Sequence, residues 1–310
     1  MAAVALAAAL LASGCGADGA GTGGGKEPAL GPVAHNPVTS SLAFPMDAFT
    51  DSDADVFRMA RVQDRITAQC MARYGFTYEG SGPAAAPAGA EDRHRYLFGV
   101  ADPAYAARYG YDKSAGAERV PPVRPALSES ADVVLHGMRP GEKPGSRPDP
   151  MTQEEADRTD SGIDVGGKKV PAGGCLREGY RKLYAPTKDS VDLLFAFGLS
   201  SEAHQRSKND SRVEAVLGKW SDCMGKAGYS GIQTPYEVVE KLRLTDDKGS
   251  PKAVAAAVKD VACKREVNLV GVWAAVEKAY QEQLAEEHAE TLALYKKQRD
   301  ARFKLAASMS

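Results

Sequence analysis

The sequence predicts a mainly α-helical domain that is stapled by disulfides, with long irregular loops and a long C-terminal helix. Three observations lead to this prediction. Apolar residues recur at helical spacing through the C-terminal half of the chain. Four cysteines follow an N-terminus that is typical of exported proteins, and proline and glycine dominate the middle of the chain. We therefore expect helices held together by Cys70, Cys175, Cys223 and Cys263.

The chain begins with an apolar segment, residues 2–12, that is too short to cross a bilayer core, which needs about 20 helical residues. We predict residues 1–14 as a signal peptide. The next residues, Ala12-Ser13-Gly14-Cys15, resemble the lipobox of bacterial lipoproteins, in which the cysteine is lipidated and becomes the mature N-terminus. Ordinary secretion is the alternative, because Ala12-x-Gly14 also fits a small-x-small cleavage site. Lipidation of Cys15 is favoured, since it removes the odd thiol from an exported chain of five cysteines.

A lipidated Cys15 predicts a protein tethered to the cell membrane on its extracytoplasmic face. Each methylene of an acyl chain such as palmitate contributes about 0.8 kcal/mol when it is buried in the bilayer. Residues 15–44 are rich in glycine, alanine and proline and lack an apolar period, so we expect a flexible stalk there. No later stretch reaches 18 uninterrupted apolar residues.

The charge of the chain is nearly balanced, with 39 basic and 41 acidic residues. Binding to a nucleic-acid backbone relies on concentrated lysine and arginine. The sequence therefore predicts no nucleic-acid partner.

Residues 45–112 form the expected N-terminal helical segment. Met59, Val62, Ile66 and Cys70 recur at spacings of three and four, which is typical of one helical face, and Gly75 ends the helix. Residues 113–173 are rich in proline, glycine and charge, so we expect loops there with one small helix near Thr152. Residues 174–310 form a C-terminal helical region that we expect to share one domain with residues 45–112.

The C-terminal region carries helix start signals. Ser211 with Glu214 and Thr234 with Glu237 have the form of capping boxes, and Ser250-Pro251 opens a further helix. No proline follows Pro251, so we expect one long helix or a kinked pair to about residue 303. Its buried stripe should contain Leu269, Trp273, Val276, Tyr280 and Leu284.

Two cysteines occur in a repeated motif, Cys70-Met71-x-x-x-Gly75-Phe76 and Cys223-Met224-x-x-x-Gly228-Tyr229. A glycine just past a helix adopts the left-handed conformation in a Schellman cap, and the residue after it contacts the third residue from the helix end. Each motif therefore predicts a helix terminus with a thiol beside it.

Four exported cysteines allow three pairings. We favour Cys70 with Cys175 and Cys223 with Cys263, because the second bond would join two neighbouring C-terminal helices. Structural staples are the expected role. The chain contains no C-x-x-C motif, so a thioredoxin-like or zinc-knuckle role has little support.

Motifs for catalysis and metal binding are incomplete. Asp51-x-Asp53-x-Asp55 begins like a calcium loop, but valines stand at its turn and closing positions, so we interpret it as the acidic first turn of a helix. No two histidines have helical ligand spacing, and we expect each to be a surface or capping residue: His35, His94, His136, His204 and His288. Neither a zinc-peptidase helix nor a Gly-x-Ser-x-Gly elbow is complete. We therefore predict no catalytic residue, metal or cofactor.

Several segments resemble an uncharacterised family of actinobacterial secreted lipoproteins. They are "CMARYGF", "ADPAYAARYGY", "VPAGGC", "WSDCM" and "VACKREVNLVGVW", and they lie between Pro45 and His288. The resemblance implies an envelope location and paired cysteines. It implies no catalytic residue.

We therefore expect a lipid-anchored binding or interaction protein of the cell envelope, with an envelope protein or a glycan as partner. The alternatives are a surface hydrolase without a local motif, whose distant acid pair only the fold would reveal, and a structural envelope component. A deep pocket holding perturbed carboxylates would favour an enzyme. A broad exposed apolar patch would favour binding.

Overall fold

The structure is a computed structural model that describes residues 27–80, 92–114 and 126–309. It confirms the mainly helical fold class, with two short 3-10 helices and one small hairpin. The elements are η1 (Thr39–Ser41), η2 (Pro45–Phe49), α1 (Asp53–Ala72), α2 (Pro103–Tyr109), α3 (Glu129–His136), α4 (Gln153–Ala156), β1 (Asp164–Val165), β2 (Lys168–Lys169), α5 (Gly174–Tyr184), α6 (Phe195–Lys208), α7 (Ser211–Lys226), α8 (Val238–Lys241), α9 (Pro251–Glu266), α10 (Leu269–Glu287) and α11 (Ala289–Ser308).

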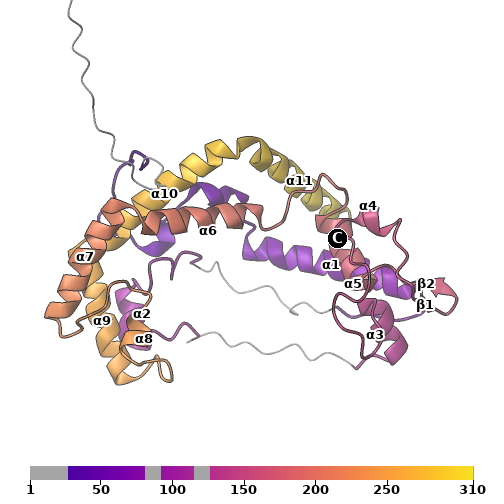
Figure 1. Ribbon diagram of the computed structural model, residues 1–310, viewed down its shortest axis with the longest axis horizontal. Coiled ribbons are helices and arrows are strands. Elements are labelled where there is room, and N and C mark those ends of the chain that lie inside the picture. The colour runs from indigo at the N-terminus through magenta and orange to yellow at the C-terminus, as the bar shows by residue number, and fades with distance from the viewer. Residues whose placement is uncertain (1–26, 81–91, 115–125, 310) are drawn as a thin grey trace, which may run out of the picture.

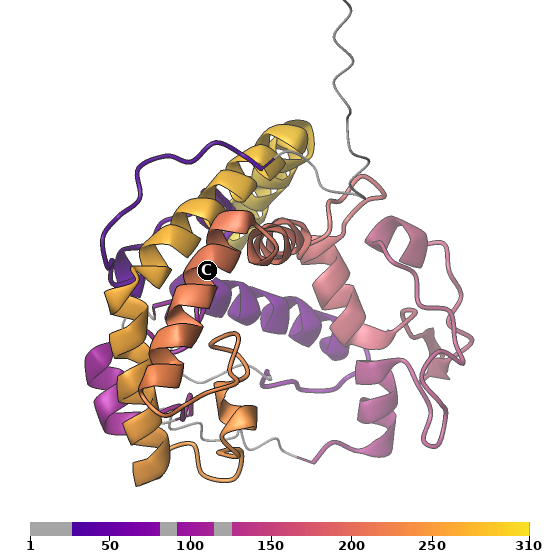
Figure 2. The ribbon, with the colours of Figure 1, turned by 60° about the vertical axis from the view of Figure 1, so that its left-hand side comes forward.

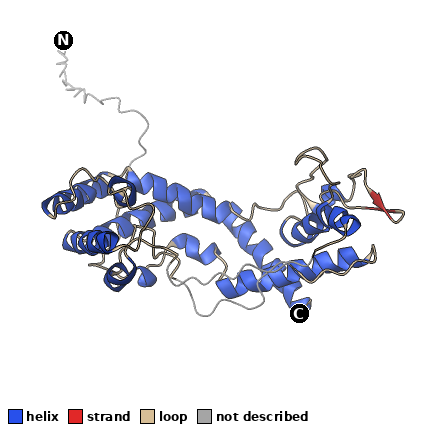
Figure 3. Cartoon of the chain, turned by 90° about the horizontal axis from the view of Figure 1, so that it is seen from below, coloured by secondary structure: helices blue, strands red, loops and turns tan. Residues whose placement is uncertain are grey.

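The helices form two lobes (Figures 1 and 3). The first lobe contains α2, α6 to α10 and the N-terminal segment 27–50. The second lobe contains α1, α3, α4, α5 and the antiparallel β1–β2 hairpin. Helix α11 begins beside the first lobe, where Leu292 joins its core, and ends in the second, where Ala306 is buried.

The first lobe has one large core. Helix α10 packs against α6, α7 and α9, and α2 packs on α9. Figure 2 brings α7 and α9 forward and shows them side by side. Trp220 of α7 and Trp273 of α10 are both fully buried at the centre. The stripe predicted on α10 is confirmed, because all five of its residues are buried.

The second lobe has two smaller apolar clusters. One surrounds Cys70 and Cys175 and includes Met71, Val134 and Ile163. The other joins α1, α5 and α11, with Met59, Val62, Ile66, Leu183 and Ala306 as its buried members. Helix α1 contributes one face to both clusters, as the spacing of its apolar residues predicts.

Both favoured disulfides are present, Cys70–Cys175 and Cys223–Cys263, each with Cα atoms 5.6 Å apart. The first joins α1 to α5 in the second lobe. The second joins α7 to α9 in the first lobe. Both bonds therefore staple neighbouring helices, and each lobe contains one.

The repeated cysteine motif forms two Schellman caps, as predicted. Gly75 and Gly228 have φ of 81° and 91°. The amide of Phe76 donates to the carbonyl of Met71 at 3.2 Å, and the amide of Tyr229 donates to that of Met224 at 2.9 Å. Each motif thus ends a helix one turn after its cysteine.

The helix starts follow the sequence signals in part. Ser250 caps α9 as predicted, since its side chain accepts from the amide of Ala253. Helix α7 is capped by Asp210 and not by Ser211, because the Asp210 carboxylate accepts from the Arg212 amide. Glu237 accepts from the amide of Thr234, but α8 begins only at Val238.

The middle of the chain differs from the expected loop region. Residues 126–173 contain α3 and the β1–β2 hairpin in addition to the small helix α4 near Thr152. Val134 and Ile163 of this region are buried in the core around the Cys70–Cys175 disulfide. Tertiary packing of these apolar residues therefore outweighs the local proline and glycine content, and this region belongs to the second lobe.

The expected long run from residue 251 to residue 303 is three helices. Asn268, with φ of 54°, separates α9 from α10, and His288 separates α10 from α11. Helix α11 is the long C-terminal helix. An asparagine tolerates the left-handed conformation better than most residues, which explains the break at this position.

Half of the expected stalk lies against the first lobe. Residues 15–26 are outside the described residues, but residues 27–44 lie along the first lobe, in contact with the start of α7 and the start of α10. The Glu27 carboxylate accepts from the amide and hydroxyl of Ser211 at 2.7 and 2.9 Å, and Asn268 bonds the backbone of Ala34 and Asn36. In the described part of the chain, no helix combines the length and apolar character that crossing a membrane requires.

Candidate functional site

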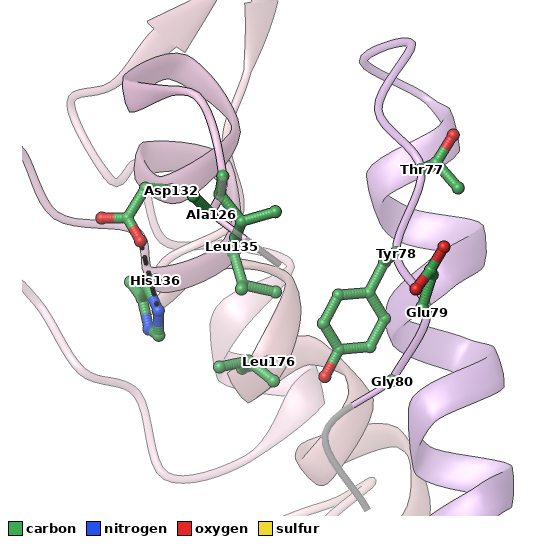
Figure 4. Close-up of a pocket in the computed structure, with 10 residues that line it drawn as sticks. Thr77, Tyr78, Glu79, Gly80, Ala126, Asp132, Leu135, His136 and Leu176 are labelled. Carbon is green, nitrogen blue, oxygen red and sulfur yellow. Dashed lines mark ion pairs between the residues drawn. The ribbon is translucent and has the colours of Figure 1, made fainter. Parts of the chain in front are cut away.

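A cavity of about 500 Å³ lies in the second lobe between residues 77–80, α3 and α5 (Figure 4). The Tyr78 ring points across it toward Leu135 of α3 and Leu176 of α5. Ala126 and Leu127 complete the apolar lining. A ligand in this cavity would therefore contact mostly apolar side chains on one side.

The cavity also has a polar edge. Asp132 and His136, one helical turn apart on α3, form an exposed ion pair with Nε2 and Oδ1 3.6 Å apart. The carboxylate of Glu79 comes from the opposite wall. Two carboxylates and one imidazole at the edge of an apolar space suit a ligand with an apolar body and a cationic group.

Local sequence features hold the walls of this cavity. Helix α3 begins at the Ser128 cap and ends at Gly137. The end of α3 and the start of α5 lie close together at Gly137 and Gly174. A Cβ atom added to Gly137 would lie 2.3 Å from the Gly174 nitrogen. The Cys70–Cys175 disulfide joins α5 to α1, which leads into residues 77–80. Two walls of the cavity are thus the helices α3 and α5, which are packed against each other and tied to α1.

An apolar groove lies where the lobes meet, beside η2, the start of α1 and the start of α6. It encloses about 280 Å³ and includes Tyr184 and Tyr295. Three large apolar side chains along it are exposed: Val56 at 56%, Leu194 at 64% and Phe197 at 71%. Such a patch is the feature that favours binding over catalysis.

A buried hydrogen-bond cluster surrounds His204 in the first lobe. The ring lies parallel to Trp273, with an interplanar angle of 5°. Its Nδ1 lies 3.0 Å from the fully buried Glu277 carboxylate, which also accepts from the Ser207 hydroxyl and the Gln281 amide. Its Nε2 lies 2.9 Å from the hydroxyl of Tyr236.

The donors in this cluster can be assigned by counting protons. The carbonyl of Leu97 can only accept, so the Tyr236 hydroxyl donates to it. The Tyr236 oxygen then accepts from Nε2 of His204, and Nδ1 of His204 faces the Glu277 carboxyl group. The described members of the cluster bond one another. It acts as a core cross-link between α6, α10 and the loop before α8.

The sequence expectation for His204 was therefore wrong. We expected a surface or capping residue, but its side chain is only 15% exposed and pairs with a carboxylate 73 residues away. One signal was available in the sequence: Glu277 and Gln281 occupy the same face of α10 as Trp273. A charged residue within an apolar stripe indicates a buried partner.

A buried ion pair links α9 to its neighbours. Lys264 Nζ lies 3.0 Å from Asp260 and 2.6 Å from the Val100 carbonyl. Asp260 also accepts from Trp220 and Tyr111. Burial raises the pKa of Asp260 against the opposing effect of these donors, and burial lowers the pKa of Lys264.

The other candidates from the sequence take structural positions. Asp53 and Asp55 lie in the acidic first turn of α1, as predicted, while Asp51 pairs with Arg299 of α11. The surface expectation was also wrong for His94, whose side chain is 14% exposed and whose Nε2 lies 3.1 Å from Asp47. Among the histidines, only His136 borders the 500 Å³ cavity. Over residues 27–80, 92–114 and 126–309, no three potential metal ligands come together. Cys15 lies outside the described residues.

No protein-family model, no curated protein and no solved structure matches the chain.

Proposed function

We propose that the protein is a lipid-anchored, extracytoplasmic binding protein, tethered to the cell membrane through Cys15 and binding a small ligand in the cavity beside Tyr78. The single observation that carries the binding function is this cavity of about 500 Å³, with an apolar lining and a polar edge. That volume lies within the usual range for small-molecule sites, about 300 to 1,000 Å³. The exposed apolar groove beside Phe197 also supports binding as the function.

The chemistry of the lining defines the ligand class. The Tyr78 ring and two leucines favour an aromatic or branched aliphatic body. Glu79 and Asp132 favour a positive charge, which His136 only partly offsets at one of them. We therefore propose an amine that carries an apolar group.

The position of the N-terminal segment supports the proposed tether. Glu27 bonds the start of α7 in the first lobe, and Cys15 precedes it by 12 residues. A chain of that length spans at most about 40 Å. An anchor at Cys15 would thus hold the first lobe near the membrane and leave the second lobe with its cavity to the envelope space.

Binding can be tested by calorimetric titration with three matched probes, 2-phenylethylamine, 2-phenylethanol and phenylacetate. We expect the amine to bind most tightly and the acid most weakly. Tyr78→Ala should weaken binding of the amine at least tenfold, since one buried aromatic side chain contributes about 1.5–3 kcal/mol. Tyr109→Ala, a half-buried tyrosine in the first lobe, is the matched control. Equal affinities of Tyr78→Ala and the unchanged protein would refute this site.

The anchor can be tested separately by fractionation of cells that produce the full-length protein. We expect the unchanged protein in the membrane fraction and Cys15→Ala in the soluble extracytoplasmic fraction. Mass spectrometry of the mature N-terminus should show a diacylated cysteine. Membrane retention of the Cys15→Ala variant would contradict the proposed anchor without affecting the proposed cavity.

A further inference from the structure

A second cavity, of about 300 Å³, lies in the second lobe between the end of α5, the loop at residues 186–190 and α11. Its apolar lining includes Leu183, Ala301 and Leu305. Gln298 of α11 holds the loop, because it accepts from the Val191 amide and donates to the Asp189 carbonyl, both at 2.8 Å. The cavity is therefore preformed.

Arg302 lines this cavity and is only 6% exposed. Its guanidinium lies over the rings of Tyr184 and Tyr295, with Cζ 5.5 and 5.8 Å from their centres. The aromatic rings stabilise the faces of the guanidinium, and the Tyr295 hydroxyl also bonds Arg302, but neither tyrosine carries a charge that neutralises it. Among the described residues, the buried Nη2 atom of Arg302 has no hydrogen-bond partner.

The other buried basic side chains in the described chain are partnered differently. Lys264 pairs with Asp260 at 3.0 Å. Arg181 donates to the carbonyl of Ala172 at 2.6 Å and lies 3.9 Å from Asp149. The Nε atom of Arg181 also lacks a partner among the described residues, but its guanidinium has Asp149 nearby. Arg302 is also buried, and no carboxylate of the described chain lies within ion-pair distance of it. A buried cation without a counter-ion is unfavourable, and an anion in the adjoining cavity would remove that penalty.

We propose that this cavity binds a carboxylate with a short aliphatic body, with the carboxylate paired with the guanidinium of Arg302. The planar guanidinium presents paired N–H donors that match the two oxygens of a carboxylate. The Ser190 hydroxyl, which accepts from the Thr187 amide at 3.2 Å, also lines the cavity. The aliphatic part lies against Leu183, Ala301 and Leu305. This site is independent of the cavity beside Tyr78.

The test is a calorimetric titration of the full-length protein with octanoate, acetate and inorganic phosphate. We expect saturable binding of octanoate at least tenfold tighter than that of acetate or phosphate. The acetate arm measures the contribution of the aliphatic body, and the phosphate arm measures a general affinity for anions.

Two pairs of variants locate the site on α11. Arg302→Met removes the cation, and Lys304→Met removes the same charge from an exposed position on the same helix. Leu305→Glu places a competing carboxylate at the cavity, and Leu294→Glu places it at a residue of equal exposure, 39%, outside the lining. Because Leu305 is half exposed, its variant keeps the test usable if Arg302→Met fails to fold.

We expect Arg302→Met and Leu305→Glu each to weaken octanoate binding at least tenfold, and both controls to leave it unchanged. Octanoate binding that is absent, no tighter than acetate binding, or unaffected by Leu305→Glu would overturn the proposal. Loss of 2-phenylethylamine binding in Tyr78→Ala with retained octanoate binding would show that the two sites are separate.

Discussion

The two lobes differ in whether their buried polar groups have hydrogen-bond partners. In the first lobe, the Asp260–Lys264 pair and the Glu277–His204 pair are surrounded by further donors and acceptors. In the second lobe, three buried polar atoms lack partners within the described chain, and they belong to Gln153, Arg181 and Arg302. We propose that the first lobe is the scaffold and that the second lobe, which contains both proposed cavities, binds the ligands.

The hydrophobic core of the first lobe is also larger than the cores of the second lobe. One large cluster containing both tryptophans fills the first lobe, whereas two small clusters and a disulfide hold the second. Small cores contribute less hydrophobic stabilisation, so the second lobe depends more on its covalent staple. Because both tryptophans of the chain lie in the first lobe, fluorescence reports that lobe and circular dichroism reports both.

The largest effects should come from removing the disulfides. Loop-closure entropy assigns about 5 kcal/mol to Cys70–Cys175, which are separated by 105 residues, and about 4 kcal/mol to Cys223–Cys263, which are separated by 40. In Cys70→Ala/Cys175→Ala, urea should remove helical ellipticity before tryptophan fluorescence changes. In Cys223→Ala/Cys263→Ala, fluorescence should shift early. The same order of transitions in both variants would contradict the division into lobes.

The next largest contrast is between two buried cations. Lys264→Met leaves Asp260 buried without its counter-ion and should lower the free energy of unfolding by about 3–5 kcal/mol. Arg302→Met removes a cation that has no ion-pair partner in the described chain, so without ligand it should cost less than about 1 kcal/mol or stabilise. Urea unfolding of both variants measures the difference. Equal losses of unfolding free energy in the two variants would mean that other groups of the protein already offset the buried charge of Arg302.

Acid should lower the stability of the first lobe, because Asp210 becomes protonated and its hydrogen bonds with Arg212 weaken. Burial alone raises the pKa of this carboxyl, but hydrogen bonds from Arg212 and Tyr280 outweigh it and hold the pKa below its usual value. A lowered folded-state pKa contributes stability above the unfolded-state value, and that stability is lost as the pH falls through the folded-state pKa. Fluorescence-detected urea midpoints should therefore fall below about pH 4.

Asp210→Asn tests this assignment directly. It should lower stability at pH 7 by about 1–2 kcal/mol and flatten the acid dependence, because the charged partner of Arg212 is gone. An acid profile as steep as that of the unchanged protein would assign the effect to other carboxyls, such as Asp47, whose pKa is also lowered in the folded state.

The smallest effects should come from the two Schellman glycines, and they should be alike in the two lobes. Gly75→Ala and Gly228→Ala each place a Cβ in open space but in a left-handed conformation. Each should therefore lose about 1–2 kcal/mol from backbone strain alone. Thermal unfolding of the two variants checks this. A loss several times larger in one of them would show that its cap carries tertiary contacts as well.

The sequence predicts features that depend on local hydrogen bonds or helical period. The Cys-Met motifs fixed both helix ends, and the α10 stripe identified buried residues, because each signal lies within one or two turns. The stop at Asn268 and the start of α3 at Ser128 also had local signals, a residue that tolerates positive φ and a capping residue. The absence of proline after Pro251 favoured a continuous helix over a stop at Asn268. The prolines around Ser128 favoured a loop over a helix start.

The sequence could not predict features that depend on contacts between distant residues. His204 meets Glu277 across 73 residues, and the cavity beside Tyr78 is closed by α3, 50 residues further along the chain or more. The missing counter-ion of Arg302 depends on which carboxylates of the described chain lie too far away to pair with it. Such sites are set by tertiary packing, for which one sequence carries no periodic signal.

Native-state hydrogen exchange of the unliganded protein tests most directly whether the lobes are a scaffold and a ligand-shaped part. The account predicts that amides of α7, α9 and α10 exchange only through global unfolding. Amides of α3 and α5 should exchange through an opening of lower free energy, and ligand should raise it. Equal opening free energies in both lobes, unchanged by ligand, would contradict the account.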